Sequence, residues 1–377
     1  MKLVALALVL ATLAGCADDG AVSSTRLQPT AQMTRAVPAG WCLNAPAPHV
    51  PTGKVQFLSK VSAPAANDVW VLGGYDTGQE SGPRGEFAAH WDGSSWQLRM
   101  LRIPEGGVIE DIAAVNAHDV WVVGSGERNH PLIEHWDGFG WSDVVSRNAG
   151  GLNAITALSP DDVWAVGGAV GDRSLIEHWD GSSWHVMPNP AIGTLEAVSA
   201  ASPSDIWAVG ERGDSAPQTW SNTLTEHWDG SSWRVVPSPT VPGPSGKRFD
   251  WLFGVSATPT GAWAVGMRGT PPGIGGGGEH ALVLHRTRGR WQLVSPPRSA
   301  PADILWSVTT AGGSPWVVGE KGVYGMLIAH FSHGRWVEPH LPASQGYPSE
   351  VTPIPGGVLV VGQTHSQRPL VMRCSVD

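Results

Sequence analysis

The sequence predicts an all-β fold, a seven-bladed β-propeller built from four-stranded antiparallel blades. Three observations lead to this prediction. A tryptophan-rich motif recurs along most of the chain, its strands are apolar on both faces, and one copy is divided between the two chain ends. A strand that is covered on both sides carries consecutive apolar residues instead of alternating them with polar ones.

The repeating unit is clearest between residues 152 and 186. Residues 162–167 read Asp-Val-Trp-Ala-Val-Gly, a strand with apolar side chains on both faces, and residues 175–179 form the next strand. Asp180-Gly181 is a strong hairpin signal, and a further strand follows it. With residues 152–157 as the innermost strand, the unit is a four-stranded antiparallel meander.

The number of copies of this unit can be counted from two tryptophans that recur in it. They recur about 43 to 56 residues apart, close to the 40–50 residues of a propeller blade. The tryptophan of the second strand occurs in six copies: Trp70, Trp121, Trp164, Trp207, Trp263 and Trp316. The tryptophan after the hairpin turn also occurs in six copies: Trp96, Trp141, Trp184, Trp233, Trp291 and Trp336.

A seventh copy is incomplete, and its missing strand lies at the other end of the chain. Residues 357–362 and 369–374 match the second and third strands of the unit, and then the sequence ends. Residues 41–46 match the outer strand, with Trp41 aligned to Trp233. We therefore expect an N-terminal strand to close the last blade.

The N-terminal residues have the pattern of an export signal. Residues 1–15 contain Lys2 and then an apolar run that is too short to span a bilayer. The run ends in Leu-Ala-Gly-Cys16, which resembles the lipobox of bacterial lipoproteins. The resemblance implies that Cys16 is diacylated after cleavage and anchors the protein to the outside of the cytoplasmic membrane. The alternative is an ordinary cleaved signal peptide.

The remaining chain divides into two parts. Residues 16–40 lack hydrophobic periodicity, which predicts a flexible tether, and residues 41–377 contain the propeller. The formal net charge is −9, and there are no basic runs, which argues against nucleic-acid binding. We expect a monomer.

Two cysteines remain for the exported domain. Cys374 aligns with the third-strand position of Trp179, and Cys42 aligns with His185 on the neighbouring strand. In an oxidising compartment this arrangement predicts a disulfide that locks the two chain termini where the ring closes.

The segment 41–374 resembles bacterial repeat propellers of the kelch/galactose-oxidase-like and Asp-box-like kind. The Asp-box turn reads Ser-x-Asp-x-Gly-x-x-Trp, whereas residues 179–184 read Trp-Asp-Gly-Ser-Ser-Trp, with Asp and Gly adjacent. The kelch pattern of paired glycines and a tyrosine occurs once, at residues 73–75. The resemblance implies a propeller and gives little support to sialidase activity.

Recurrent polar residues do not predict a catalytic, cofactor or metal site. A histidine recurs once per blade at one strand position, so the six copies cannot converge on one metal ion. They are His90, His135, His178, His227, His285 and His330. We interpret them as structural residues hydrogen-bonded between blades, and we interpret Glu134, Glu177 and Glu226 in the same way. No nucleophile elbow, His-Glu-x-x-His motif or P-loop is present.

One pattern is not explained by the repeat. Every loop between the second and third strands holds a basic residue, and in propellers these loops surround one mouth of the central channel. The seven residues, named the basic collar below, are Arg84, Arg128, Arg173, Arg212, Arg268, Lys321 and Arg368. They could bind an anionic ligand, because arginine matches carboxylate and phosphate groups. The alternative is a set of solvated loops with local ion pairs.

Two function classes remain open. The first is a non-catalytic binding module for a glycan or a protein outside the membrane, with its site on the face that carries the long inserts 211–223, 237–250 and 267–281. The second is a carbohydrate-active enzyme, a glycoside hydrolase or lyase, whose acidic groups are spread over loops of that same face.

Overall fold

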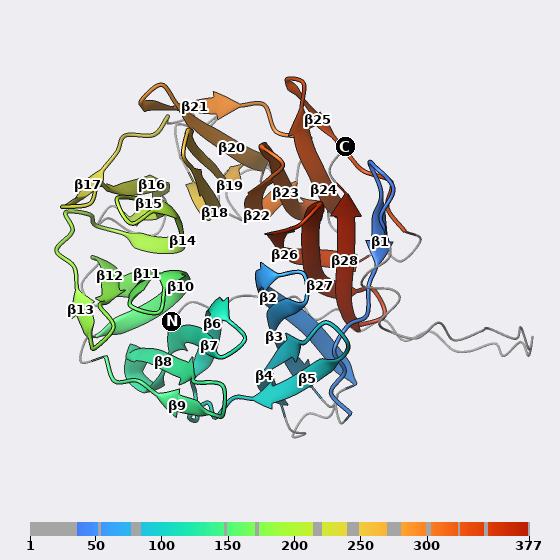
Figure 1. The fold of residues 1–377 in the computed structure, drawn as a ribbon. Coiled ribbons are helices and arrows are strands. Elements are labelled where there is room, and N and C mark those ends of the chain that lie inside the picture. The colour runs from blue at the N-terminus through green and yellow to red at the C-terminus, as the bar shows by residue number, and fades with distance from the viewer. Residues whose placement is uncertain are drawn as a thin grey trace, which may run out of the picture.

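The computed structural model describes residues 36–51, 54–76, 84–146, 149–169, 173–213, 221–239, 249–269, 280–298, 303–322, 325–342 and 346–375. Within these residues 28 strands form seven four-stranded blades around a central channel (Figure 1). The predicted fold is confirmed. The predicted signal segment, Cys16 and tether residues 17–35 lie outside the described residues, as do the middle parts of the three long inserts.

The strands run in order from the channel to the rim in the first three blades. Blade one contains β2 (Val55–Ala65), β3 (Asp68–Asp76), β4 (Arg84–Trp91) and β5 (Trp96–Met100). Blade two contains β6 (Val108–Asn116), β7 (Asp119–Ser125), β8 (Pro131–Trp136) and β9 (Trp141–Asp143), with a 3-10 helix at Glu127–Asn129. Blade three contains β10 (Gly150–Ser159), β11 (Asp162–Ala169), β12 (Ser174–Trp179) and β13 (Trp184–Val186).

The next blades repeat this order. Blade four contains β14 (Thr194–Ser202), β15 (Asp205–Gly213), β16 (Ser221–Trp228) and β17 (Trp233–Val235). Blade five contains β18 (Phe249–Thr258), β19 (Gly261–Gly269), β20 (His280–Thr287) and β21 (Arg290–Val294). Blade six contains β22 (Ile304–Ala311), β23 (Ser314–Lys321), β24 (Gly325–Ser332) and β25 (Arg335–Val337). Blade seven contains β26 (Gly346–Ile354), β27 (Gly357–Thr364), β28 (Pro369–Ser375) and, at its rim, β1 (Cys42–Asn44).

The antiparallel order gives the ring two different faces. The turns between first and second strands and between third and fourth strands lie on one face, named the turn face below. The connections between second and third strands and from blade to blade lie on the other, named the loop face. No helix among the described residues is long and apolar enough to cross a membrane.

The last blade closes as predicted. β1 pairs antiparallel with β28, and Cys42 faces Cys374 in this ladder. Their sulfur atoms form a disulfide, with the two Cα atoms 4.0 Å apart. The predicted register is wrong by one residue, because Cys42 takes the position that Trp184 takes opposite Trp179, and Trp41 precedes it.

The hydrophobic core is divided among the seven seams between neighbouring blades. The two faces of each second strand pack in two different seams, which explains why both faces are apolar. In β3, Val69 and Val71 pack toward blade seven, whereas Trp70 and Leu72 pack toward blade two. At the seam between blades six and seven, Trp316 packs in one cluster with the disulfide.

The repeated histidines are structural, but their partners lie within the blade and not between blades. Each histidine ring stacks on the second-strand tryptophan of its own blade, with centroids 3.9 to 4.6 Å apart. In blades one to four, histidine Nε2 also lies 2.8 to 2.9 Å from the aspartate that opens the second strand, as in the His178–Asp162 pair. For the histidines of blades one to four, the predicted hydrogen bonds between blades are therefore wrong, because the partner is the aspartate on the adjacent strand of the same blade.

The repeated glutamates do lie between blades. Ser146 of blade two donates a hydrogen bond of 2.8 Å to Glu177 of blade three, and Ser174 of blade three donates one of 3.0 Å to Glu226 of blade four. Burial raises the pKa of Glu226 to about 7, and the Ser174 hydrogen bond opposes this only in part. Burial and the nearby Asp143 raise the pKa of Glu134 to about 7 as well.

Steric hindrance explains why each Trp-Ala-Val-Gly motif, or its equivalent in the other blades, ends in glycine. Every inner strand contains a β-bulge, and the bulge brings its backbone against the second strand. A Cβ added at Gly167 would lie 2.0 Å from the carbonyl oxygen of Gly151. The equivalent glycines of the other six blades meet the same obstacle: Gly73, Gly124, Gly210, Gly266, Gly319 and Gly362.

Candidate functional site

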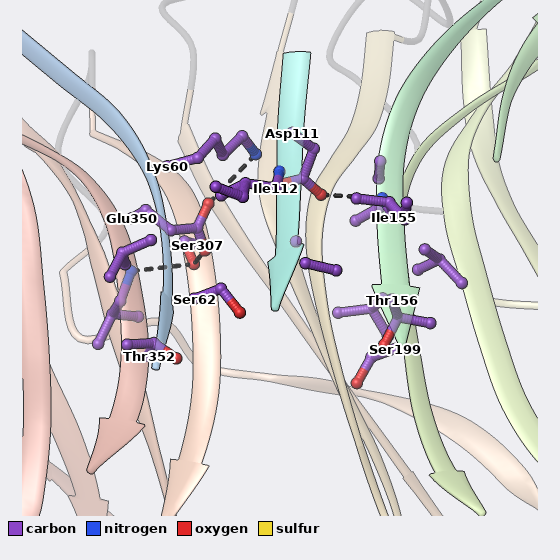
Figure 2. Close-up of a pocket in the computed structure, with 18 of the residues that line it drawn as sticks. Lys60, Ser62, Asp111, Ile112, Ile155, Thr156, Ser199, Ser307, Glu350 and Thr352 are labelled. Atoms are coloured by element: carbon purple, nitrogen blue, oxygen red, sulfur yellow. Dashed lines mark hydrogen bonds and ion pairs between the residues drawn. The ribbon is translucent and has the colours of Figure 1, made fainter. Parts of the chain in front are cut away.

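The central channel contains a cavity of about 230 Å³, lined by the inner strands of all seven blades (Figure 2). Its wall is polar on one side, and on the other side the ring of Phe253 lines it. The volume is smaller than the roughly 300–1,000 Å³ of sites that enclose a small-molecule ligand. The cavity can therefore receive one side chain or one sugar unit, with the rest of a ligand outside it.

The polar side is built around an ion pair between the first and last blades. Lys60 Nζ donates to Glu350 Oε2 at 3.2 Å, and Ser307 donates a short hydrogen bond to the other oxygen of Glu350. Asp111 lies beside this pair and accepts hydrogen bonds of 2.9 Å from the backbone N–H groups of Ile112 and Ile155 (Figure 2). Four neighbouring inner strands thus contribute to one charged group: β2, β6, β22 and β26.

Burial and mutual interaction perturb these charges. Burial disfavours the charged form of Lys60, but attraction to Glu350 and Asp111 outweighs it and raises the lysine pKa above its usual value. Burial raises the pKa of Asp111 to about 6, since the attraction of Lys60 only partly offsets it and Glu350 adds repulsion. Lys60 is therefore charged at neutral pH and faces two carboxyl groups.

The aromatic side belongs to blades five and six. Trp251 and Phe253 follow each other along β18 with ring centroids 5.2 Å apart, and Trp306 of β22 lies 5.0 Å from Phe253. All three side chains are half-buried, and Phe253 lines the cavity. β18 and β22 start at the loop face, so these rings lie in that half of the channel.

One carboxyl group accompanies the aromatic side. Trp306 Nε1 donates to Glu320 Oε1 at 3.3 Å, and burial raises the pKa of Glu320 above its usual value. In the other five blades the bulge positions equivalent to Phe253 and Trp306 hold polar residues: Ser59, Glu110, Asn153, Glu196 and Ser349. The two sides of the channel therefore differ because of residues that break the repeat.

Hydroxyl groups line the part of the channel nearer the turn face (Figure 2). The Ser62 hydroxyl accepts a hydrogen bond of 3.0 Å from the backbone N–H of Ala114 in the next blade. The Ser199 hydroxyl accepts one of the same length from the N–H of Ala257. Thr156 and Thr352 lie at the same level of their inner strands. A group that enters from the loop face meets aromatic rings and charges first and hydroxyls deeper in the channel.

The basic collar is separate from this cavity, since none of its seven residues lines the wall. Arg128, Arg173, Arg212 and Arg368 are exposed, whereas Arg268 and Lys321 are half-buried. Arg128 lies 3.7 Å from Glu127, and Lys321 lies 3.3 Å from Glu338. Arg84 opens β4, and its side chain lies outside the described part of the chain.

The residues of the cavity wall were not predicted, although the sequence contains signals for them. Phe253 lines the cavity, and the rings packed against it, Trp251 and Trp306, are tryptophans on inner strands, outside the positions that the repeat assigns to tryptophan. Lys60, Asp111 and Glu350 are charged residues at an inner-strand position that holds a small residue in the other four blades. Within the described residues no group of three or more His, Cys, Asp and Glu side chains is arranged to hold a metal ion.

Comparison with known proteins supports the fold. No protein-family model matches the chain, and no curated protein sequence matches it. Among solved structures, the chain is similar to "YCF48 bound to D1 peptide", with a TM-score of 0.55, 16% identity, and coverage of 89% of this chain and 96% of that one. It is also similar to "Structure of U3-55K", with a TM-score of 0.57, 9% identity, and coverage of 90% and 99%.

A third similar structure is the β-propeller domain of the Trilobed protease from Pyrococcus furiosus, described as having an open velcro topology. Its TM-score is 0.54 and its identity 8%, with coverage of 85% of this chain and 94% of that one. At these identities the similarities concern the propeller fold alone.

Proposed function

We propose that this protein is a non-catalytic binding module, held outside the cytoplasmic membrane by lipid on Cys16. In this proposal it takes a glycan or a protein partner at the loop-face mouth of the channel. The observation that carries the proposal is the divided channel wall, in which the Trp251, Phe253 and Trp306 rings lie across from Asp111 and near the Lys60–Glu350 pair.

Such a wall suits a group with one apolar and one polar face. Aromatic rings offer a large apolar contact area with little conformational entropy to lose, and a few fixed polar groups set the orientation of a ligand. A pyranose ring and a long peptide side chain both have this character. YCF48, a propeller of similar fold, is described with a bound peptide, which supports the use of this architecture for peptide recognition.

The basic collar adds a second element to the proposal. Four of its residues are exposed on the loop face, where they would attract an anionic part of the ligand. Binding of an anionic ligand should then weaken as salt rises, because exposed charges are screened over about 8–10 Å at ordinary ionic strength. Arg212→Ala combined with Arg268→Ala should reduce the affinity, and Arg212→Ala alone should not change the thermal stability, because the Arg212 side chain is exposed.

Screening the chain against a glycan array and a random peptide library tests the proposal. We expect binding to at least one class of probe, reduced more than about ten-fold by Phe253→Ala or Trp306→Ala, as for central aromatic contacts. Phe139→Ala is the matched control, since Phe139 is 95% exposed on the turn face and should not affect binding. Binding that both channel variants retain in full would place the site elsewhere.

A carbohydrate-active enzyme is the second candidate, favoured by one observation. Asp111 and Glu350 interact electrostatically inside the channel, and glycosidases act with two carboxyl groups about 5–10 Å apart. Against it, Glu350 is paired with Lys60 and bonded to Ser307, and Asp111 accepts two backbone N–H groups. Hydrolysis or elimination of any bound glycan, abolished by Asp111→Asn, would favour the enzyme.

The anchor has its own test. Cys16→Ala in the native host should leave an unprocessed precursor or release the protein from the membrane fraction, and metabolic labelling with a fatty acid should mark only the unaltered chain. If the variant is processed and membrane-bound as before, lipid on Cys16 is not the anchor.

A further inference from the structure

The turn face of the ring is divided into an acidic and a basic part. In blades one to four, the turn between third and fourth strands begins with an exposed aspartate that accepts two backbone N–H groups of the turn. These residues are Asp92, Asp137, Asp180 and Asp229. The aspartates that pair with the repeated histidines lie at the same strand ends, and Asp161 is exposed beside them.

Blades five and six replace these acids with bases. The corresponding turns have the same length but read Thr-Arg-Gly-Arg and Ser-His-Gly-Arg, so Arg288, Arg290, His333 and Arg335 occupy them. All four side chains are exposed. Among the described residues, none of the three arginines forms an ion pair, and the turns between first and second strands of blades five to seven hold no acid. This group of four residues is named the basic edge below.

The N-terminal segment joins the ring at blade seven, the neighbour of blade six. Ser375 N–H at the end of β28 donates to Trp41 O at 3.0 Å, so the chain enters blade seven where β28 ends, at the turn face. The Trp41 ring also packs at an angle against His340, in the segment that follows the last strand of blade six, with ring centroids 4.7 Å apart. Blade six is thus the neighbour of the point at which the preceding chain, with Cys16, is attached.

We infer that the basic edge docks on the anionic headgroups of the membrane to which the chain is anchored. The ring then rests on blades five and six, its acidic blades one to four tilt away from the bilayer, and the loop-face mouth points outward. The inference uses the proposed anchor only to bring the membrane near, and it does not depend on the nature of the ligand. A tether that holds the edge at high local concentration strengthens a weak contact of this kind.

Charge complementarity selects an anionic bilayer over a second copy of the chain. A basic side chain near an anionic surface gains about a five-fold increase in binding, so three arginines give roughly a hundred-fold. In a dimer, the acidic blades of one copy would have to face the basic blades of the other. Each copy has three arginines on this face but at least five exposed aspartates, so some aspartates of the two copies would face each other and repel.

Vesicle co-sedimentation tests the inference. The probe is the chain from residue 16 onward with Cys16→Ser, which has neither signal segment nor lipid, mixed with vesicles of phosphatidylcholine alone or containing phosphatidylglycerol. We expect at least ten-fold stronger binding to the anionic vesicles, falling as salt rises. Arg288→Glu with Arg290→Glu and Arg335→Glu should reduce it to the level of neutral vesicles.

A matched variant makes the test specific. Arg128→Glu with Arg173→Glu and Arg212→Glu changes the net charge by the same amount on the loop face and should leave vesicle binding unchanged. Equal binding to both vesicle types, or loss in the loop-face variant only, would overturn the inference. So would a salt-sensitive dimer in sedimentation that disappears in the basic-edge variant while anionic vesicles bind no better than neutral ones. Ligand binding by the channel is measured separately and can succeed or fail independently.

Discussion

Lys60 and Glu350 are 290 residues apart in sequence, and their side chains pair at 3.2 Å where the first blade meets the last. The pair lies in the wall of the cavity with about a quarter or less of each side chain exposed. It therefore joins the closure of the ring to the candidate site.

Removing one partner of this pair should destabilise the ring. Lys60→Met leaves Glu350 and Asp111 partly buried without a cation, and we expect a loss of about 1–4 kcal/mol in the free energy of unfolding at pH 7.5. Lys60→Met combined with Glu350→Gln should recover part of that loss. A denaturant double-mutant cycle measures the coupling; additive effects of the two substitutions would mean that the pair contributes nothing.

The disulfide should stabilise the closed ring. Cys42→Ser with Cys374→Ser opens a loop of sequence separation 332, and we expect a loss of about 2–5 kcal/mol in the unfolding free energy. Reduction of the unaltered protein should give a similar loss, whereas the double variant should not respond to reductant. If peptide mapping of the protein isolated from its native host finds both thiols free, the closure is not covalent.

Neighbouring glycines should respond very differently to alanine. Gly167→Ala places Cβ against the backbone of the bulged inner strand and should destabilise the protein by about 1–3 kcal/mol. Gly168→Ala meets side-chain atoms of Thr194 at 3.2 Å and no backbone atom as close, and it should change the stability by less than about 1 kcal/mol. Thermal unfolding of the two variants compares them directly, and equal effects would contradict the steric role of the bulge.

Buried glutamates should make the protein less stable as pH rises through the range of their shifted pKa. Since the folded-state pKa of Glu226 is raised from 4.5 to about 7, the folded state binds the extra proton, and its stabilisation is complete below about pH 4.5 and lost by pH 7 to 8. Glu226→Gln should flatten this decline by on the order of 1–3 kcal/mol.

A control for the pH effect is available on the turn face. The turn hydroxyl and N–H groups lower the pKa of Asp229 to about 2, so its contribution is present above about pH 4 and lost only as pH falls further. Asp229→Asn should therefore alter unfolding in acid and leave the decline between pH 4.5 and 7 unchanged. A decline that persists in full in Glu226→Gln would assign it to other buried carboxyl groups, such as Glu134.

The repeat made the architecture predictable, because the sequence of each copy indicates its strands, its hairpin turn and the two apolar faces of its second strand. The register of β1 was harder. Trp41 has the identity of the turn tryptophan, but the position opposite the third strand belongs to Cys42, since the disulfide requires the two cysteines to face each other. The sequence alignment therefore placed Trp41 at the position that Cys42 occupies in the structure, and only the hydrogen-bond register of β1 shows this.

The channel site could not be read from the repeat because it is built from departures from it. Lys60, Asp111 and Glu350 lie on inner strands that are far apart in sequence, and only the closure of the ring brings them together. The β-bulges that direct Phe253 and Trp306 are marked in the sequence only by the glycine on the facing strand, which does not identify the bulged residue. The partner of the repeated histidine was misjudged for a related reason, since Asp162 lies close to His178 only through the ladder between β11 and β12.

Closure of the last blade also fixes an order of events during synthesis. Among the described strands, β1 is the first to be made, and the strand with which it pairs in the sheet, β28, is the last. Blades one to six can pair from local sequence as they emerge, whereas β1 must wait through the synthesis of every other strand. Until then Trp316 lacks the partner that covers it, and an apolar seam is open to proteases and to other nascent chains. Quality control of this protein should therefore depend on the arrival of its final seven-residue strand.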